Sequence, residues 1–235
     1  FNGSTQYAEV PATSSALNLT GDFTLEAWVK PTTNCASAYC VIAGRDNNYL
    51  LGVSNGTYRW QVSTSSGVST WYDTGVPISP GQWQHVALVR SGASVLFYLN
   101  GQLMTTQNNG DTDASGLTIA LTATSQAGFG WFELAARGAE HSDMFTGGID
   151  DVRVWNAVRT AAAIGDPATG DFNRSLNSTE LASATLVAYW DMNDTPSRGV
   201  WMSKKSTAIY TTDLTYFGVP TYVTNGAGVA VEKLL

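Results

Sequence analysis

The chain has 235 residues, of which 43% are hydrophobic, and carries a formal net charge of −7 at pH 7. An acidic chain without a basic stripe argues against nucleic acid as a partner. No apolar run reaches the roughly 18 residues that a membrane helix needs, so we expect no membrane insertion. The length suits one large β-sandwich, and we begin from one domain.

Apolar and polar residues alternate with a period of two along most of the chain, which is typical of half-buried strands. The first strong run covers residues 23–30, and Pro31 ends it. Further strand-like runs are residues 49–53, 58–62, 83–90, 95–99, 117–121 and 149–155. Turn signals recur about every ten residues between them, which favours an antiparallel sandwich or barrel.

The sharpest turn signal is the dipeptide Asn100-Gly101, which lies between the apolar runs 95–99 and 102–104. A type I′ turn needs positive φ at both central positions, and asparagine and glycine tolerate this best. We therefore predict a tight hairpin here. Helical character is confined to the alanine-rich residues 160–164, which predict one or two turns.

Two cysteines, Cys35 and Cys40, bracket a short loop of small polar residues. No histidine or third cysteine lies nearby, so the pattern is poor for zinc and compatible with a tight disulfide. Such a ring contributes about 2 kcal/mol on the chain-entropy model. A disulfide indicates an oxidising compartment and hence a secreted or cell-surface protein, while two free thiols are the alternative.

The strand pattern weakens after residue 164 and returns at residues 186–190. We predict a core of residues 1–164, with residues 165–235 forming a surface excursion and C-terminal strands packed on the same domain. A separate domain of about fifty residues without cysteines would be marginal. The chain begins at Phe1, and we expect adjacent domains in a longer polypeptide.

Four motifs follow one another in an order and spacing that point to a known family. They are residues 1–31, which include Phe1-Asn2-Gly3 and the run Leu17–Pro31, then residues 46–56, 83–101 and 148–156. Together they resemble a laminin-G-like jelly-roll domain over residues 1 to about 165. The resemblance implies an all-β fold, a two-sheet antiparallel jelly-roll β-sandwich of the concanavalin A-like type. This fold hosts lectins, hydrolases and structural domains alike, so it does not fix the function.

Hydrolases of this fold that cleave β-glucans carry a pair of carboxylates on one strand, about 5 Å apart on one face. The sequence contains no Glu-x-Asp-x-Glu or Glu-x-Asp-x-x-Glu run. A nucleophilic site lacks its Gly-x-Ser-x-Gly turn, and only His85 and His141 could serve as base. We therefore predict no enzymatic activity and no catalytic residue, with a polysaccharide-degrading enzyme of atypical site as a minor alternative.

The resemblance also implies one structural Ca²⁺ at the rim, held by an aspartate at the start of the last core strand and by backbone oxygens near the N-terminus. Asp150 matches that aspartate, and Asn2 and Asp22 are further candidates for the metal site. Calcium takes about six to eight oxygens and accepts backbone donors, so such a site leaves little trace in sequence. The alternative is that these side chains only cap turns.

Sugar recognition pairs an aromatic face with a few fixed hydrogen-bonding groups. Of the eight tryptophans, Trp28, Trp83 and Trp155 lie in family-like core strands and are assigned to packing. The candidates for ligand binding lie in more polar or glycine-rich surroundings, although core packing is the default for any large aromatic. They are Trp60, Trp71, Tyr72, Trp131, Arg45, Asp46, Arg137 and His141.

We predict a non-catalytic carbohydrate-binding, lectin-like or adhesion module of a larger secreted or cell-surface protein. Its partner would be a polysaccharide or glycan, or an extracellular protein. The alternative is a structural or protein-interaction domain of an extracellular fibre or matrix protein. A sugar-sized groove lined by Trp60, Trp71 or Trp131 would favour the first reading.

Overall fold

The structure is a computed structural model of the 235-residue chain. It describes residues 1–11, 14–32, 35, 38–63, 69–92, 94–104, 130–138, 140–193, 200–201 and 214–217. The strand predicted at residues 117–121 lies outside the described residues. Within the described part, no helix is both long enough and apolar enough to cross a membrane.

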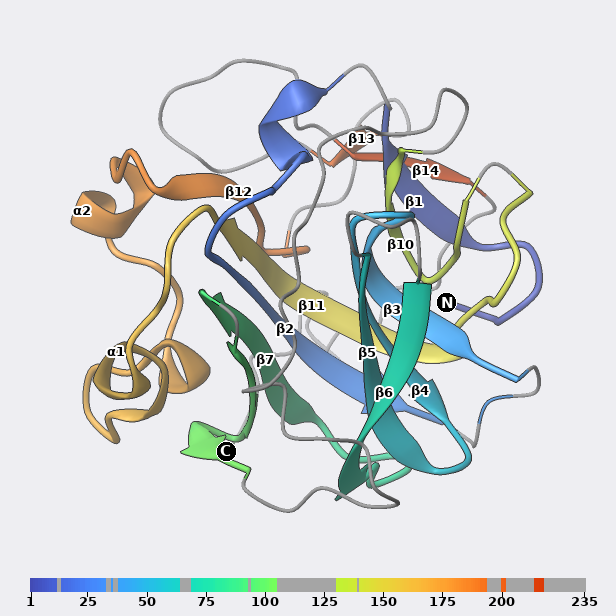
Figure 1. The fold of residues 1–235 in the computed structure, drawn as a ribbon, viewed down its shortest axis with the longest axis horizontal. Helices are drawn as coiled ribbons and strands as arrows, with labels where there is room; N and C mark the ends of the chain where they lie inside the picture. The colour runs from blue at the N-terminus through green and yellow to red at the C-terminus, as the bar shows by residue number, and fades with distance from the viewer. Residues whose placement is uncertain are drawn as a thin grey trace, which may run out of the picture.

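Two antiparallel sheets make up the molecule (Figure 1). One sheet contains β1 (Tyr7–Val10), β3 (Cys40–Arg45), β4 (Tyr49–Ser54), β5 (Thr57–Ser63), β6 (Ser69–Pro77), β10 (Phe132–Leu134), β13 (Val200–Trp201) and β14 (Leu214–Phe217). The other contains β2 (Phe23–Pro31), β7 (Gln84–Ser91), β8 (Ser94–Leu99), β9 (Gln102–Leu103), β11 (Gly147–Trp155) and β12 (Leu186–Trp190). Their orders are β13-β14-β1-β10-β3-β4-β5-β6 and β12-β11-β2-β7-β8-β9. The predicted two-sheet antiparallel β-sandwich is confirmed.

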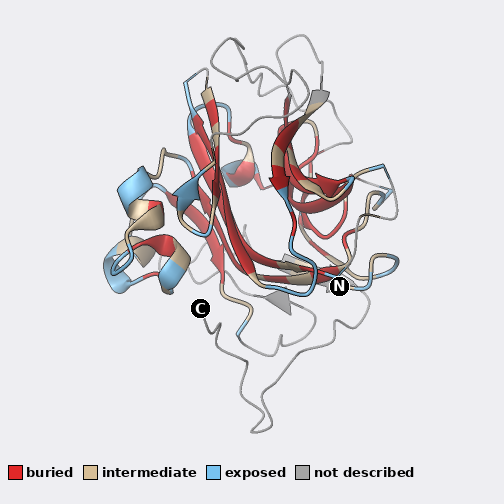
Figure 2. Cartoon of the chain, turned by 90° about the horizontal axis from the view of Figure 1, so that it is seen from below, coloured by how far each residue is buried: buried red, intermediate tan, exposed pale blue. Residues whose placement is uncertain are grey.

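The hydrophobic core lies between the two sheets, where Figure 2 shows buried segments on both layers. Period-two alternation selects the residues that enter it, because successive side chains of a strand point to opposite faces. On β1, Ala8 and Val10 are fully buried, and on the neighbouring β10, Phe132 and Leu134 are fully buried as well. Glu9, between the first two, therefore projects from the outer face of the eight-stranded sheet.

The segment after β11 covers the outer face of the six-stranded sheet (Figure 2). It contains α1 (Ala161–Gly165), η3 (Asp171–Asn173) and α2 (Ser178–Leu181), while a further short helix, η1 (Ser15–Leu17), precedes β2. A buried charge network holds the segment in place. Arg153 on β11 donates to the backbone oxygens of Asp171 at 2.7 Å and Arg174 at 2.6 Å. Arg159 binds the Asp171 carboxylate through two hydrogen bonds of 2.8 Å.

Three local predictions from the sequence are confirmed. Cys35 and Cys40 form a disulfide with a Cα separation of 5.5 Å. Asn100 and Gly101 form the turn between β8 and β9, with φ of 48° and 78°. The alanine-rich stretch forms α1, capped by the Thr160 side chain, which accepts a hydrogen bond from the backbone of Ala163.

Gly101 offers a test of how closely the covering segment packs. A Cβ at this position would lie 2.6 Å from Phe172 and 2.9 Å from Gly165, and φ is already +78°. Gly101→Ala should lower the free energy of unfolding by about 2–4 kcal/mol, since overpacking adds to left-handed strain. Urea unfolding measures this loss.

Gly92→Ala is the matched control, because Gly92 has φ of +59° with nothing within 4 Å of a Cβ. Gly92→Ala should lower the free energy of unfolding only by the cost of left-handed strain, about 1–2 kcal/mol. Equal losses in the two variants would contradict the packing described here.

Candidate functional site

A tight hairpin loop between β10 and β11 lies over the outer face of the eight-stranded sheet. Arg137 and Ser142 exchange backbone hydrogen bonds of 2.9 and 3.0 Å, and the His141 amide donates to the Gly138 oxygen at 2.8 Å. Gly138 and His141 both have positive φ, 66° and 47°, which the turn requires. The turn brings His141 back over the strands β1 and β10.

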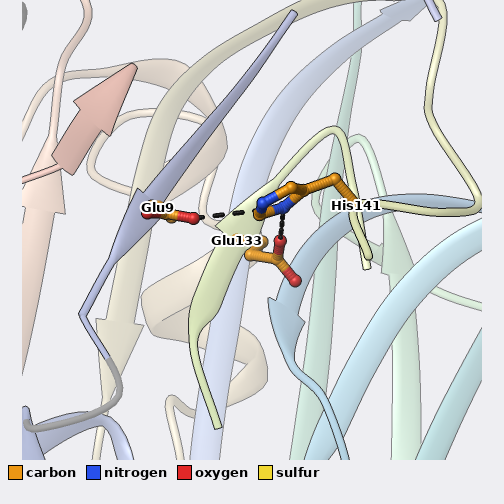
Figure 3. Close-up of side chains that lie close together, drawn as sticks. All are labelled: Glu9, Glu133 and His141. Atoms are coloured by element: carbon orange, nitrogen blue, oxygen red, sulfur yellow. Dashed lines mark hydrogen bonds and ion pairs between the residues drawn. The ribbon is translucent and has the colours of Figure 1, made fainter. Parts of the chain in front are cut away.

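His141 faces two glutamates from these neighbouring strands (Figure 3). Glu9 on β1 and Glu133 on β10 are direct partners in the antiparallel pair, so their side chains share one face. The Nδ1 atom of His141 lies 2.9 Å from Glu133 Oε1 and 4.0 Å from Glu9 Oε2. The Glu133 side chain is only 1% exposed, and that of Glu9 is 12% exposed.

Burial dominates the electrostatics of this cluster. Burial raises the pKa of Glu133 to about 8; the charges of Glu9 and Asp46 act in the same direction, and the Gly138 amide and Arg137 oppose them. Burial also raises the pKa of Glu9 to about 7 and lowers the pKa of His141. The cluster therefore keeps protons on carboxyl groups near neutral pH, which exposed glutamates do not.

Aromatic rings flank His141. The Tyr7 ring stacks on the imidazole with centroids 3.9 Å apart and an interplanar angle of 19°. The Trp131 ring lies 5.6 Å from it at 32°. All three side chains are partly exposed. Stacking therefore fixes the direction of Nδ1 while part of the aromatic surface faces solvent.

Charged side chains continue the site beside the rings. Arg137 Nε donates to Asp46 Oδ1 at 2.9 Å, and Arg137 Nη1 lies 3.5 Å from Asp143 Oδ2. Arg45 is buried and donates to the backbone oxygen of Ser14 at 2.8 Å. Two anionic partners thus hold one guanidinium, 25% exposed, in a fixed place.

Five of the predicted ligand-binding residues lie at or beside this site: Arg45, Asp46, Trp131, Arg137 and His141. Arg45 lies next to Gly130, the residue before Trp131. A Cβ on Gly130 would lie 3.1 Å from the Arg45 guanidinium. Arg45 thus contributes packing, whereas the other four bring rings or charges.

The remaining three lie elsewhere. Trp60 is 6% exposed and belongs to the core, where its ring stacks on Tyr72 at 4.3 Å. Both face inward because they are direct partners across β5 and β6. Trp71 points to the outer face and stacks on Tyr39 at 4.9 Å. Strand order places it roughly 19 Å from Trp131, four strand spacings away.

Glu9 and Glu133 were not predicted from the sequence. Each is the single acid of a short alternating run, Ala8-Glu9-Val10 and Phe132-Glu133-Leu134, and only the pairing of the two strands brings them together. A search for two acids on one strand could not find a pair assembled across strands. The carboxyls of a retaining glycosidase flank the scissile bond about 5 Å apart. Here Glu133 is almost fully buried and bound by His141, so the pair is not open to a glycosidic bond.

The predicted calcium ligands do not meet. Asp150 pairs with Trp28 on β2, whereas Asp22 precedes the first residue of that strand, about 20 Å away at ~3.3 Å per residue. Asn2 bridges to Thr146, about 13 Å along β11 from Asp150. Oxygens of Asn2, Asp22 and Asp150 accept backbone hydrogen bonds within local turns or from a neighbouring loop. One ion cannot be held by all three, and calcium at Asp150 with backbone oxygens stays a prediction.

The two-sheet antiparallel sandwich, with its loop site on one outer face, defines a jelly-roll protein of the lectin and glucanase class. Residues 2–165 match the family described as the Concanavalin A-like lectin/glucanases superfamily, and the chain belongs to this family. The laminin-G-like resemblance is thereby confirmed. No curated protein matches the sequence.

Several solved structures are similar. A candidate carbohydrate-binding protein from Bacteroides ovatus ATCC 8483 has a TM-score of 0.64 and 19% identity, over 91% of this chain and 56% of that one. This chain thus spans little more than half of that protein. The SAP-like pentraxin of Limulus polyphemus has a TM-score of 0.47 and 17% identity, over 73% and 79% of the two chains. Domain 4 of AbnA, an extracellular arabinanase from Geobacillus stearothermophilus solved with arabinotriose, has a TM-score of 0.46 and 21% identity, over 71% of this chain and 73% of that one. At 19% identity, the likeness to the Bacteroides ovatus protein shows the fold alone.

The raised pKa of Glu133 makes stability depend on pH. The unfolded chain has an ordinary glutamate, so the stability that Glu133 contributes as a neutral acid is lost as pH rises through about 8. Between about pH 6.5 and pH 9 the free energy of unfolding of the wild-type chain should fall by about 1–3 kcal/mol more than that of Glu133→Gln. Urea unfolding with a chelator present measures the difference, and parallel pH profiles would contradict the burial of this carboxyl.

Proposed function

We propose that the chain is a non-catalytic carbohydrate-binding module of a larger extracellular protein. Its ligand would lie on a surface formed by Tyr7, Trp131, Arg137 and His141, called here the aromatic patch. The observation that carries the proposal is the packing of two partly exposed rings, Tyr7 and Trp131, against His141 beside a guanidinium held by two carboxylates.

This combination matches the chemistry of a sugar. The C–H faces of a pyranose stack on aromatic rings, and its hydroxyls need donors and acceptors at fixed positions. Arg137 is held by Asp46 and Asp143, so a ligand that binds it need not order a flexible side chain. The partly exposed carboxylate of Asp143, 21% exposed, offers acceptors at the same edge.

The family and the placement of Glu9 and Glu133 support binding over catalysis. The family description names lectins and glucanases, and the similar protein from Bacteroides ovatus is named for carbohydrate binding. Glu9 and Glu133 are directed at His141, and neither flanks an open surface as the acids of a glycosidase do. The disulfide between Cys35 and Cys40 supports a secreted or cell-surface location.

The test is affinity electrophoresis through gels that contain different polysaccharides. The wild-type chain should be retarded by at least one of them. Trp131→Ala should weaken that retardation about tenfold, because it removes a stacking ring and the apolar area that it buries. Circular dichroism would verify that the variant is folded.

Trp71→Ala is the matched control, since it removes the same kind of ring from the same outer face, roughly 19 Å away. Its retardation should equal that of the wild type. Loss of binding in Trp71→Ala alone would indicate that the ligand binds at the Tyr39–Trp71 stack instead. Migration of the wild type unchanged by every polysaccharide, or release of reducing ends from one of them, would contradict the proposal.

A further inference from the structure

We propose that Glu9, Glu133 and His141 bind a divalent transition-metal ion, with Zn²⁺ as its representative. Each glutamate would supply one carboxylate oxygen and His141 would supply Nδ1. The site is distinct from the predicted calcium site and goes beyond carbohydrate binding, because an ion would bind here whether or not a sugar does.

The three ligand atoms already converge, since they lie within 4.8 Å of one another (Figure 3). Zinc bonds of about 2.0–2.2 Å place neighbouring ligand atoms roughly 3–4 Å apart. Nδ1 of His141 is 2.9 Å from Glu133 and 4.0 Å from Glu9, so closure around an ion needs side-chain shifts of about 1 Å or less.

One oxygen atom of the cluster is buried without a hydrogen bond from the described residues. The Oε2 atom of Glu9 is buried and has no hydrogen-bond partner among the residues that the structure describes. It faces Nδ1 of His141 at 4.0 Å, so it points into the space between the three ligands. A buried polar atom left unsatisfied lowers stability, and a bound cation would remove this cost.

Charge favours a divalent ion. Two carboxylates this close repel each other when both are ionised, and burial strengthens the repulsion. Arg137 lies nearby, but its guanidinium binds Asp46 and Asp143. Among the described residues, the structure records no direct contact between Arg137 and either glutamate. One doubly charged cation would balance both glutamates at once.

The ligand types point to a transition metal and away from calcium. Calcium takes about six to eight oxygens, whereas imidazole nitrogen suits zinc, copper, iron and nickel. Three protein ligands leave at least one position for water, as in open zinc sites. Two further contacts preset the ligands: Tyr7 stacks on the imidazole, and the Gly138 amide donates to the Glu133 carboxyl.

Isothermal titration of ZnCl₂ into the untagged, chelator-treated chain tests the proposal. The wild type should bind one ion per chain. Glu9→Gln and His141→Phe should each weaken binding at least about tenfold, because each removes one ligand atom. His141→Phe keeps a ring against Tyr7, so the stack survives the loss of nitrogen.

Glu140→Gln is the matched control. Glu140 is an exposed acid next to His141 and lies outside the cluster, so the variant loses the same charge and should bind zinc as the wild type does. A second measurement needs no variant: Co²⁺ added to the wild type should give visible absorption that Zn²⁺ abolishes.

Absence of zinc binding by the wild type would overturn the proposal. Unchanged affinity in folded Glu9→Gln and His141→Phe would overturn it too, as would a Co²⁺ spectrum no different from that of the hydrated ion. Polysaccharide retardation is read separately, with and without chelator, so failure of the metal site and failure of carbohydrate binding give different results.

Discussion

The pairing register of β1 with β10 is the constraint on which the site depends. Alternation sends four apolar side chains of these strands into the core: Ala8, Val10, Phe132 and Leu134. Burying a large apolar side chain stabilises the fold by about 1.5–3 kcal/mol, and a slip of one residue would instead turn Glu9 and Glu133 inward. The register that builds the core therefore also forces two carboxyls together on the outer face.

Buried charge occurs on both outer faces of the sandwich, with different consequences. On the six-stranded sheet, Arg159 binds the Asp171 carboxylate through two hydrogen bonds of 2.8 Å. Arg153 donates to the backbone oxygen of Asp171 at 2.7 Å, and its guanidinium lies 3.8 Å from the carboxylate. That network attaches the segment with α1 and α2 to the sheet. On the eight-stranded sheet, two acids meet one histidine, and burial raises the pKa of both carboxyl groups. Perturbed pKa values of this kind cluster at functional sites.

Period-two alternation and the family resemblance were enough to predict the sandwich. The Asn100-Gly101 turn and the disulfide were predictable from local sequence, because each depends on residues close together in the chain. The site was predictable in part, since His141, Trp131 and Arg137 come from one glycine-rich stretch. Trp60 was predicted to bind ligand because its sequence neighbours, Arg59 and Gln61, are polar. These neighbours point outward because side chains alternate along a strand, so Trp60 itself points into the core. The Glu9–Glu133 pair joins segments far apart in the chain, and no local pattern records a cross-strand pairing.

Cysteine cross-linking measures this register most directly. In a chain with Glu9→Cys and Glu133→Cys, opposed Cβ atoms about 4.5–5.5 Å apart should form a disulfide on mild oxidation. A chain with Tyr7→Cys and Glu133→Cys carries a diagonal pair about 7–8 Å apart and should remain reduced. Peptide mass spectrometry identifies the links beside the native Cys35–Cys40 bridge. A bridge in the diagonal pair, with none in the direct pair, would contradict the register and the site built on it.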